Sequence, residues 1–374
     1  MAARPTTRKT TDRPIAVPSR PAVRDFSGGT TYAVEWDVRP VYDFVFSLSE
    51  DAGSTDDLPA ADRQWLTDAR SSLPQDVRAS VSRLFEHEVA VQVATFAVEH
   101  PELRTPRQFV EALEAAPPSE VVKAVLCEAF LTPGLPELLE RALAGDESIF
   151  DEVEEKLPDW RRDERIAMLR DVEGTHAEIV KVLRAWLEVF EPIVERVAAL
   201  EERDHALRAA ERVTLPPGDL IERATGGIRW LGEPGVRRII LAPSLFTRPY
   251  NFLLAGPDFR FFGYPIADEA LEPSDPLAPP QAVMRLHRAL GDDTRLRILK
   301  LLASGDLYLT EIAQQLDLSK PTIKHHLAML RAAGVVTIME SGTVIYYSLR
   351  RQRFDEMATD LKRFLLSGED TRRH

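Results

Sequence analysis

The stretch LTEIAQQLDLSKPTIKHHLAMLRAAGVV, residues 309–336, decides the fold of the C-terminal part of this chain. Its apolar residues recur at steps of three and four in two blocks, which predicts two amphipathic helices with a corner at Leu318. Ser319 suits the N-terminal cap of the second helix, and Pro321 fits its first turn. Gly334 suits the left-handed position just past its end. Two capped helices joined by a tight corner predict a helix-turn-helix.

The second helix has one apolar and one polar face. Ile323, Leu327 and Leu330 are spaced four and three residues apart, and we expect them to be buried. The polar side chains near the N-terminal end of the helix then point outward: Ser319, Lys320, Thr322, Lys324 and His325. A recognition helix presents its base-reading groups at this end. Taken alone, Lys320 and Lys324 would indicate only an ordinary solvated helix face. Together with the two capped helices, the corner and the hairpin that follows, they favour DNA binding.

The flanking sequence predicts the rest of a small domain. Asp292 is a suitable cap for a helix that Gly305 ends, and Thr310 is a suitable cap for the first helix of the pair. After Gly334 the pattern changes to strand, turn and strand, ending in IYYSL (345–349). A helix-turn-helix followed by such a hairpin is a winged helix-turn-helix.

Three segments carry a resemblance to a known family: GDDTRLRILKLL (291–302), residues 309–336, and VIYYSL (344–349). They resemble the winged helix-turn-helix domain of the ArsR/SmtB family of bacterial transcriptional regulators, over about residues 281–366. The resemblance implies that the polar side chains from Ser319 to His325 approach the major groove of double-stranded DNA. It also implies that a wing centred on Ser341 and Gly342 lies along the DNA backbone or the minor groove. The wing turn carries Glu340 and no Lys or Arg, so we expect positive charge to come from residues just beyond it, which are Arg350, Arg351 and Arg353.

The resemblance further implies a homodimer that reads two half-sites. Its interface would involve two flanking helices, with Val283, His287 and Leu290 in 281–290 and Phe354, Met357, Leu361 and Phe364 in 352–366. Packing of these residues within one subunit is the alternative. A second alternative keeps the winged helix but makes it a protein-interaction or dimerisation module without DNA binding.

We expect neither metal nor another cofactor. Metal-sensing members of the family carry a Cys-x-Cys pair where this chain has Leu307 to Thr310, and others use histidines in the terminal helix, where this chain has none before His374. Cys127 is the single cysteine, so no internal disulfide can form. We found no nucleophile elbow, phosphate-binding glycine loop or metal motif, so we expect no enzymatic activity.

The formal net charge of −13 is unevenly distributed. Residues 1–25 hold six Arg or Lys against two Asp, residues 26–280 hold 26 basic against 47 acidic residues, and residues 281–374 hold 15 against 11. We therefore expect a disordered basic arm (1–25), an acidic body (26–267), a Pro-rich linker (268–280), the basic reading domain (281–366) and a tail (367–374). Charges separated by more than about 8 Å are largely screened at physiological salt, so an acidic body is compatible with a DNA-binding domain.

The body is predicted to be mainly helical, with a small antiparallel β section at about 228–266, which makes the fold class α+β. Its clearest helix runs from Ile179 to Leu200, with a kink expected at Pro192. A hairpin is expected at 255–258. No apolar run is long enough to span a membrane and no signal core is present, so we expect a cytoplasmic protein.

Aromatic residues gather in the predicted β section. Phe246, Tyr250, Phe252 and Phe261 could line a pocket for a small-molecule effector, and a solid core is the alternative that the sequence leaves open.

Overall fold

The computed structural model describes residues 32–53, 57–85, 90–157, 162–230, 232–271, 279–341 and 344–366. The predicted arm (1–25), most of the predicted linker, Gly342 and the tail (367–374) lie outside these residues.

The body is built on a four-stranded sheet with the order β1-β3-β5-β4. The strands are β1 (Ala33–Trp36), β3 (Arg238–Ser244), β4 (Phe252–Ala255) and β5 (Phe259–Pro265). The β4–β5 hairpin is present as predicted, and these two strands pair antiparallel. However, β3 pairs in parallel with both β1 and β5, so the sheet is mixed. The prediction of a purely antiparallel β section is therefore wrong for these strand pairs. Two parallel strands cannot be joined by a tight turn and need a long connection. β1 lies about 200 residues before β3 in the sequence, so no local turn signal predicts that they pair.

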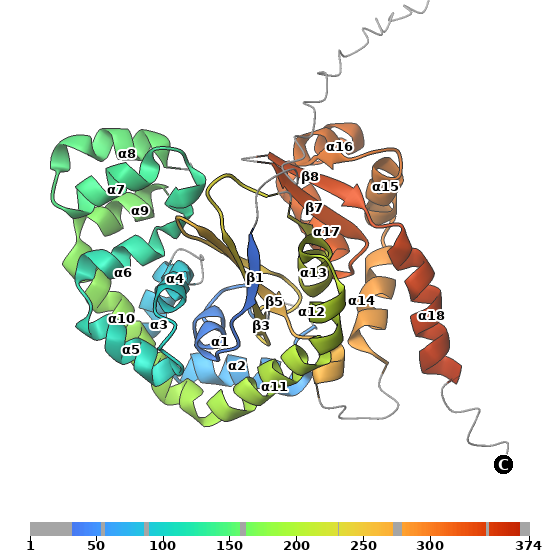
Figure 1. The fold of residues 1–374 in the computed structure, drawn as a ribbon, viewed down its shortest axis with the longest axis horizontal. Helices are drawn as coiled ribbons and strands as arrows, with labels where there is room; N and C mark the ends of the chain where they lie inside the picture. The colour runs from blue at the N-terminus through green and yellow to red at the C-terminus, as the bar shows by residue number, and fades with distance from the viewer. Residues whose placement is uncertain are drawn as a thin grey trace, which may run out of the picture.

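Helices form an arc around this sheet (Figure 1). They are α1 (Val41–Phe46), α2 (Ala60–Ser72), α3 (Gln75–Leu84), α4 (Thr95–Glu99), α5 (Pro106–Ala115), α6 (Pro118–Val125), α7 (Leu135–Leu143), α8 (Phe150–Lys156), α9 (Arg162–Arg170), α10 (Val172–Phe190), α11 (Val194–Leu207), α12 (Ala209–Thr214) and α13 (Pro217–Ala224). Short 3-10 turns join some of them: η1 (Ala90–Ala94), η2 (Cys127–Leu131), η3 (Glu147–Ile149), η4 (Glu191–Ile193) and η5 (Asp268–Ala270). Pro192 lies in η4 and separates α10 from α11, which confirms the predicted kink.

The terminal domain follows the body. Its elements are α14 (Gln281–Leu290), α15 (Asp293–Leu302), β6 (Leu307–Tyr308), α16 (Leu309–Leu316), α17 (Lys320–Ala332), β7 (Val336–Ser341), β8 (Val344–Leu349) and α18 (Gln352–Leu366). The helices α15, α16 and α17 and the hairpin β7–β8 form a winged helix-turn-helix, whose hydrophobic core is separate from that of the body. With the mainly helical body, this confirms the α+β class.

One strand of the body belongs to the sheet of the terminal domain. β2 (Ile228–Arg229) pairs in parallel with β7, which gives that sheet the order β2-β7-β8-β6. The Ile338 amide donates to the Gly227 carbonyl at 3.2 Å, and Gly227 has a φ of +133° that favours glycine. A side chain on Gly227 would also meet Thr337. The body therefore extends the wing sheet by one strand.

Ion pairs join the two domains at a second place. Arg285 of α14 lies 2.7 Å from the Asp57 carboxylate and 3.5 Å from that of Asp268. Arg248 also pairs with Asp268, whose pKa is lowered by these two guanidinium groups although burial opposes the shift. Within the described part of the chain, no helix is both long and apolar enough to cross a membrane.

A buried carboxyl pair lies at one end of the body sheet. Asp43 accepts hydrogen bonds from the Leu245 and Phe246 amides at 2.7 and 2.9 Å, and from the Ser244 hydroxyl. Glu201 of α11 is fully buried beside it. Burial, followed by the charge of Asp43, raises the pKa of Glu201 well above its usual value. Glu201 is therefore protonated over a wider pH range in the folded protein than in the unfolded chain.

Replacing Glu201→Gln should raise stability, and more so at high pH. The unfolded chain loses the Glu201 proton above about pH 4.3, whereas the folded protein keeps it, so stability is full below that pH and is lost as pH rises toward the folded pKa. The loss is on the order of 1 kcal/mol per pH unit. Urea unfolding at pH 5.5 and pH 8 measures it, with the exposed neighbour Glu202→Gln as the control. An unchanged pH slope in Glu201→Gln would contradict the assignment.

Candidate nucleic-acid interface

The orientation of α17 is set by its apolar face. Ile323, Leu327 and Leu330 are buried, as predicted, in the core of the terminal domain. The same core contains Leu286 of α14, Ile298 of α15 and Ile312 of α16, so three helices hold α17 in place. Because this face is covered, the opposite face of the helix must point to solvent.

The N-terminal end of α17 carries an exposed polar surface. We call it the reading edge: Ser319, Lys320, Thr322, Lys324 and His325, all of which are exposed. The structure thus brings together at one helix end the five residues that the sequence singled out on this helix. The two lysines can meet phosphates, and Thr322 and His325 offer hydrogen-bonding groups at a position suited to base edges.

Ser319 is partly committed to the helix itself. Its hydroxyl accepts from the Thr322 amide at 3.3 Å and lies 2.7 Å from the Thr322 hydroxyl. This confirms the predicted cap. Gly334 has a φ of +70° past the other end, which confirms the predicted stop. Ser319 therefore fixes the residue at which the reading edge begins. Because its hydroxyl is used within the helix, we expect the other side chains of the reading edge to make most of the contacts with DNA.

The two adjacent histidines of α17 have different surroundings. His325 is exposed, whereas His326 turns inward, with its Nδ1 3.7 Å from the Asp292 carboxylate. Burial lowers the pKa of His326, and the charge of Asp292 opposes this only in part. Asp292 also caps α15, because its carboxylate accepts from the Arg295 amide at 2.8 Å, as predicted. His326 is thus a packing residue, and only His325 belongs to the reading edge.

The corner between the two helices is a left-handed turn. Asp317 has a φ of +53°, and it is the only residue other than glycine with a positive φ in the described part of the chain. The predicted cap at Thr310 is wrong, because α16 begins at Leu309. Tyr308 is the residue that precedes the helix, and its amide donates to the Glu311 carboxylate at 2.9 Å.

The wing strands are present in the predicted order. β7 and β8 pair antiparallel from Val336 opposite Leu349 to Ser341 opposite Val344. Ser341 ends β7 at the wing turn, and Gly342 lies outside the described residues. β6 completes the sheet beside β8.

Arg350 does not extend freely from the base of the wing. Its side chain is 15% exposed and lies 3.9 Å from the Glu356 carboxylate. Arg353 is likewise 13% exposed and pairs with Glu356 at 3.3 Å and Asp360 at 2.9 Å. Glu356 of α18 lies beside Arg350, and the supply of positive charge to the wing by Arg350 stays a prediction.

The pairing of β2 brings a different cation to the wing. Arg229 lies opposite Met339 of β7, is half exposed, and pairs with Glu222 at 3.0 Å. Sequence reasoning missed Arg229, since nothing in residues 228–229 indicates a partner strand more than 100 residues away. The Gly226-Gly227 pair was the one local signal of an unusual backbone there.

The predicted dimer residues divide into buried and accessible groups. Val283 is buried within this chain, Leu290 is half-buried against the terminal-domain core, and His287 is exposed. In α18, Phe354 and Met357 pack against that core, while Leu361 and Phe364 are half-buried. No residue of α18 is fully buried, and its last two leucines, Leu365 and Leu366, are 64% and 53% exposed.

The predicted effector residues are core residues. Phe246, Phe252 and Phe261 are buried, and Phe252 stacks on Phe46 with ring centroids 4.4 Å apart. Tyr250 is half-buried. The structure therefore favours the solid-core alternative for this aromatic cluster.

Metal-ligating residues are dispersed. Among the residues that the structure describes, no group of three or more His, Cys, Asp or Glu side chains could hold a metal ion. Cys127 is buried, and its thiol lies 3.2 Å from the Gln92 side-chain oxygen.

Comparisons with known proteins point to one family. The family model described as "Bacterial regulatory protein, arsR family" matches residues 292–337. The transcriptional repressor SdpR of Bacillus subtilis is 36% identical over 83 residues, which are 22% of this chain and 92% of that protein. An uncharacterized HTH-type transcriptional regulator of Methanocaldococcus jannaschii is 41% identical over 73 residues, 19% of this chain and 82% of its own. The HTH-type transcriptional regulator KmtR of Mycobacterium tuberculosis is 34% identical over 88 residues, 23% of this chain and 68% of its own.

Proposed function

The chain belongs to the arsR family of bacterial regulatory proteins, and from this membership we propose that it is a transcriptional regulator that binds specific DNA sequences as a homodimer. The observation that carries the proposal is the reading edge, whose five polar side chains are exposed on a helix that is anchored on its other side. A helix held this way can enter a major groove without rearrangement of its own domain.

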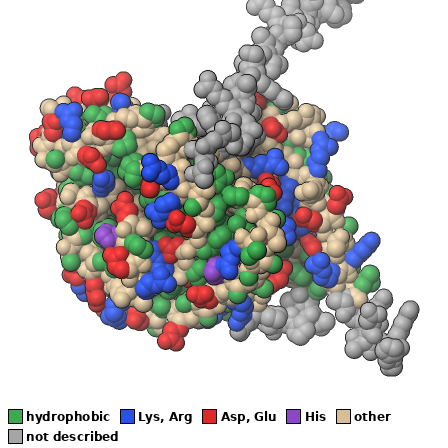
Figure 2. Space-filling view, viewed as in Figure 1, with side chains coloured by type: hydrophobic (Ala, Val, Ile, Leu, Met, Phe, Trp, Pro, Cys, Tyr) green, Lys and Arg blue, Asp and Glu red, His purple; other side chains and the backbone are tan. Residues whose placement is uncertain are grey.

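The charge distribution supports the same reading. Figure 2 shows acidic and basic side chains mixed over the helices of the body, and Lys and Arg side chains gathered along the neighbouring side of the terminal domain. The body carries the excess of acidic residues and the terminal domain the excess of basic ones. Such a distribution repels DNA from the body and directs it toward the terminal domain.

A homodimer follows from the size of the reading edge. One recognition helix reads only a few base pairs, so two copies on related half-sites supply the specificity that one lacks. α18 is suited to join them, because it presents half-buried and exposed apolar side chains along one helix. We further propose that the protein acts in the cytoplasm, without a metal ion or other cofactor and without enzymatic activity.

The double variant Lys320→Ala with Lys324→Ala should weaken DNA binding and its salt dependence. Each lost phosphate contact is expected to lower the slope of log affinity against log salt by about 1. The measurement is a gel shift from 50 to 200 mM salt, using the promoter fragment next to the protein's own gene. Lys300→Ala, at an exposed position of α15, is the control.

A shift that is unchanged in the double variant would reject the reading edge as the DNA surface. Absence of any salt-dependent duplex binding by the unmodified protein would favour the alternative function, in which the winged helix is a protein-interaction or dimerisation module.

Leu361→Glu should dissociate the proposed dimer. A charge placed in an apolar interface must be desolvated, and a buried carboxylate without a partner destabilises that interface by several kcal/mol, on the order of 3–5. Size-exclusion chromatography with light scattering should show a dimer for the parent chain and a monomer for the variant. Thr359→Glu, at an exposed position of the same helix, should leave the dimer intact. A parent chain that is monomeric at micromolar concentration would contradict the proposal.

A further inference from the structure

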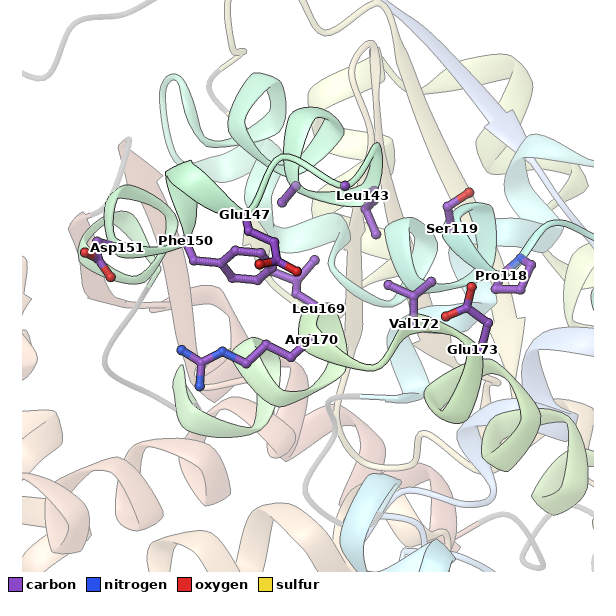
Figure 3. A pocket seen from close by; sticks show the side chains of 12 residues that line it. Pro118, Ser119, Leu143, Glu147, Phe150, Asp151, Leu169, Arg170, Val172 and Glu173 are labelled. Carbon is purple, nitrogen blue, oxygen red and sulfur yellow. The ribbon is translucent and has the colours of Figure 1, made fainter.

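A cavity of about 700 Å³ opens into the body among α6, α7, α8, α9 and α10 (Figure 3). Its volume lies within the range of about 300–1,000 Å³ that is usual for small-molecule sites. α8 and α9 lie at the far side of the body from α17, so the cavity is separate from the reading edge (Figure 1).

The floor of the cavity is apolar. It includes Leu143, Phe150, Leu169 and Val172, of which Leu169 is buried and the others are half-buried. Figure 3 shows the Phe150 ring and Leu169 beside each other at its centre. Apolar surface that is left partly open to water gains free energy when a ligand covers it, at about 25 cal/mol per Å².

The rim of the cavity is acidic. Glu147, Asp151 and Glu173 line it and are exposed, and none of the three forms a salt bridge with another described residue. Arg170 is the one Lys or Arg in the lining. Three carboxylates against one guanidinium leave the rim negative.

Helix ends do not cancel this charge. Asp151 and Glu173 lie in the first turns of α8 and α10, where an acidic side chain stabilises a helix. A helix N-terminus carries only about half a positive charge, however, so a full carboxylate exceeds it. The N-terminal end of α6 also reaches the cavity and adds partial positive charge, which the partial negative charge of the C-terminal ends of α7 and α9 offsets.

The chain itself places a cation on the aromatic ring of the floor. The Arg170 guanidinium carbon lies 6.0 Å from the centre of the Phe150 ring, which is within cation–π distance. Arg170 is exposed and held by no salt bridge among the described residues, so a ligand cation can take its place. This contact shows that the ring is accessible to a positive group.

We propose that this cavity is a binding site for an organic cation with an apolar or aromatic body. The apolar part would cover Leu143, Leu169 and Val172, and the positive group would lie between Phe150 and the carboxylates of the rim. The site does not require that the terminal domain bind DNA, so it goes beyond the function proposed above. It also relocates the effector site expected near Phe246 to a different part of the body.

Tetraphenylphosphonium and tetraphenylborate test the proposal, since the two ions have nearly the same shape and opposite charge. Isothermal titration of the full-length protein should detect the cation and not the anion. The double variant Glu147→Gln with Glu173→Gln should bind the cation about tenfold more weakly, because it keeps the shape of the rim and removes two charges. Glu188→Gln, on an exposed part of α10 outside the cavity, should bind as the parent does.

Phe150→Ala should also weaken binding of the cation, and thermal unfolding of each variant shows whether it is folded. Equal binding of both ions, equal affinity in the double variant and the parent, or no binding of the cation at millimolar concentration would each overturn the proposal. None of these outcomes depends on DNA, so the DNA-binding proposal stands or falls separately.

Discussion

The burial of Ile323, Leu327 and Leu330 is the constraint on which the account of this protein depends. Burying one such side chain contributes about 1.5–3 kcal/mol, so three of them fix the rotation of α17 far more firmly than any surface ion pair could. With that rotation fixed, the reading edge has only one direction in which to face. The Ser319 cap and the left-handed turn at Asp317 then determine where along the chain this edge starts.

The terminal domain is attached to the body by more than a linker. β2 extends the wing sheet through backbone hydrogen bonds, and Arg285 bridges Asp57 and Asp268 at a second place. A displacement of β2 must either break its pairing with β7 or move the wing along with it. The pairing of β2 with β7 thus connects the body directly to the domain that we propose binds DNA.

Local signals in the sequence predicted the terminal domain well. Capping by Asp292 and Ser319, the stop at Gly334 and the buried stripe of α17 depend on residues a few positions apart, and all are confirmed. The break at Pro192 and the β4–β5 hairpin are local in the same sense. These features need no knowledge of distant parts of the chain.

Features that depend on distant residues could not be predicted in this way. The parallel pairing of β1 with β3 and of β2 with β7 joins segments about 200 and 110 residues apart. The aromatic cluster around Phe246 looked equally suited to a pocket or a core, since composition does not report how tightly rings pack.

Hydrogen exchange of the full-length protein with and without its promoter duplex tests the central claim most directly. In the first turn of α17, Pro321 has no amide N–H and the Thr322 amide donates only to the Ser319 hydroxyl. We therefore expect this turn to exchange faster than the middle of the helix until something covers it. The account predicts slower exchange on DNA binding at residues 319–325, with little change in the acidic body. Protection confined to the body, with residues 319–325 unaffected by bound DNA, would contradict it.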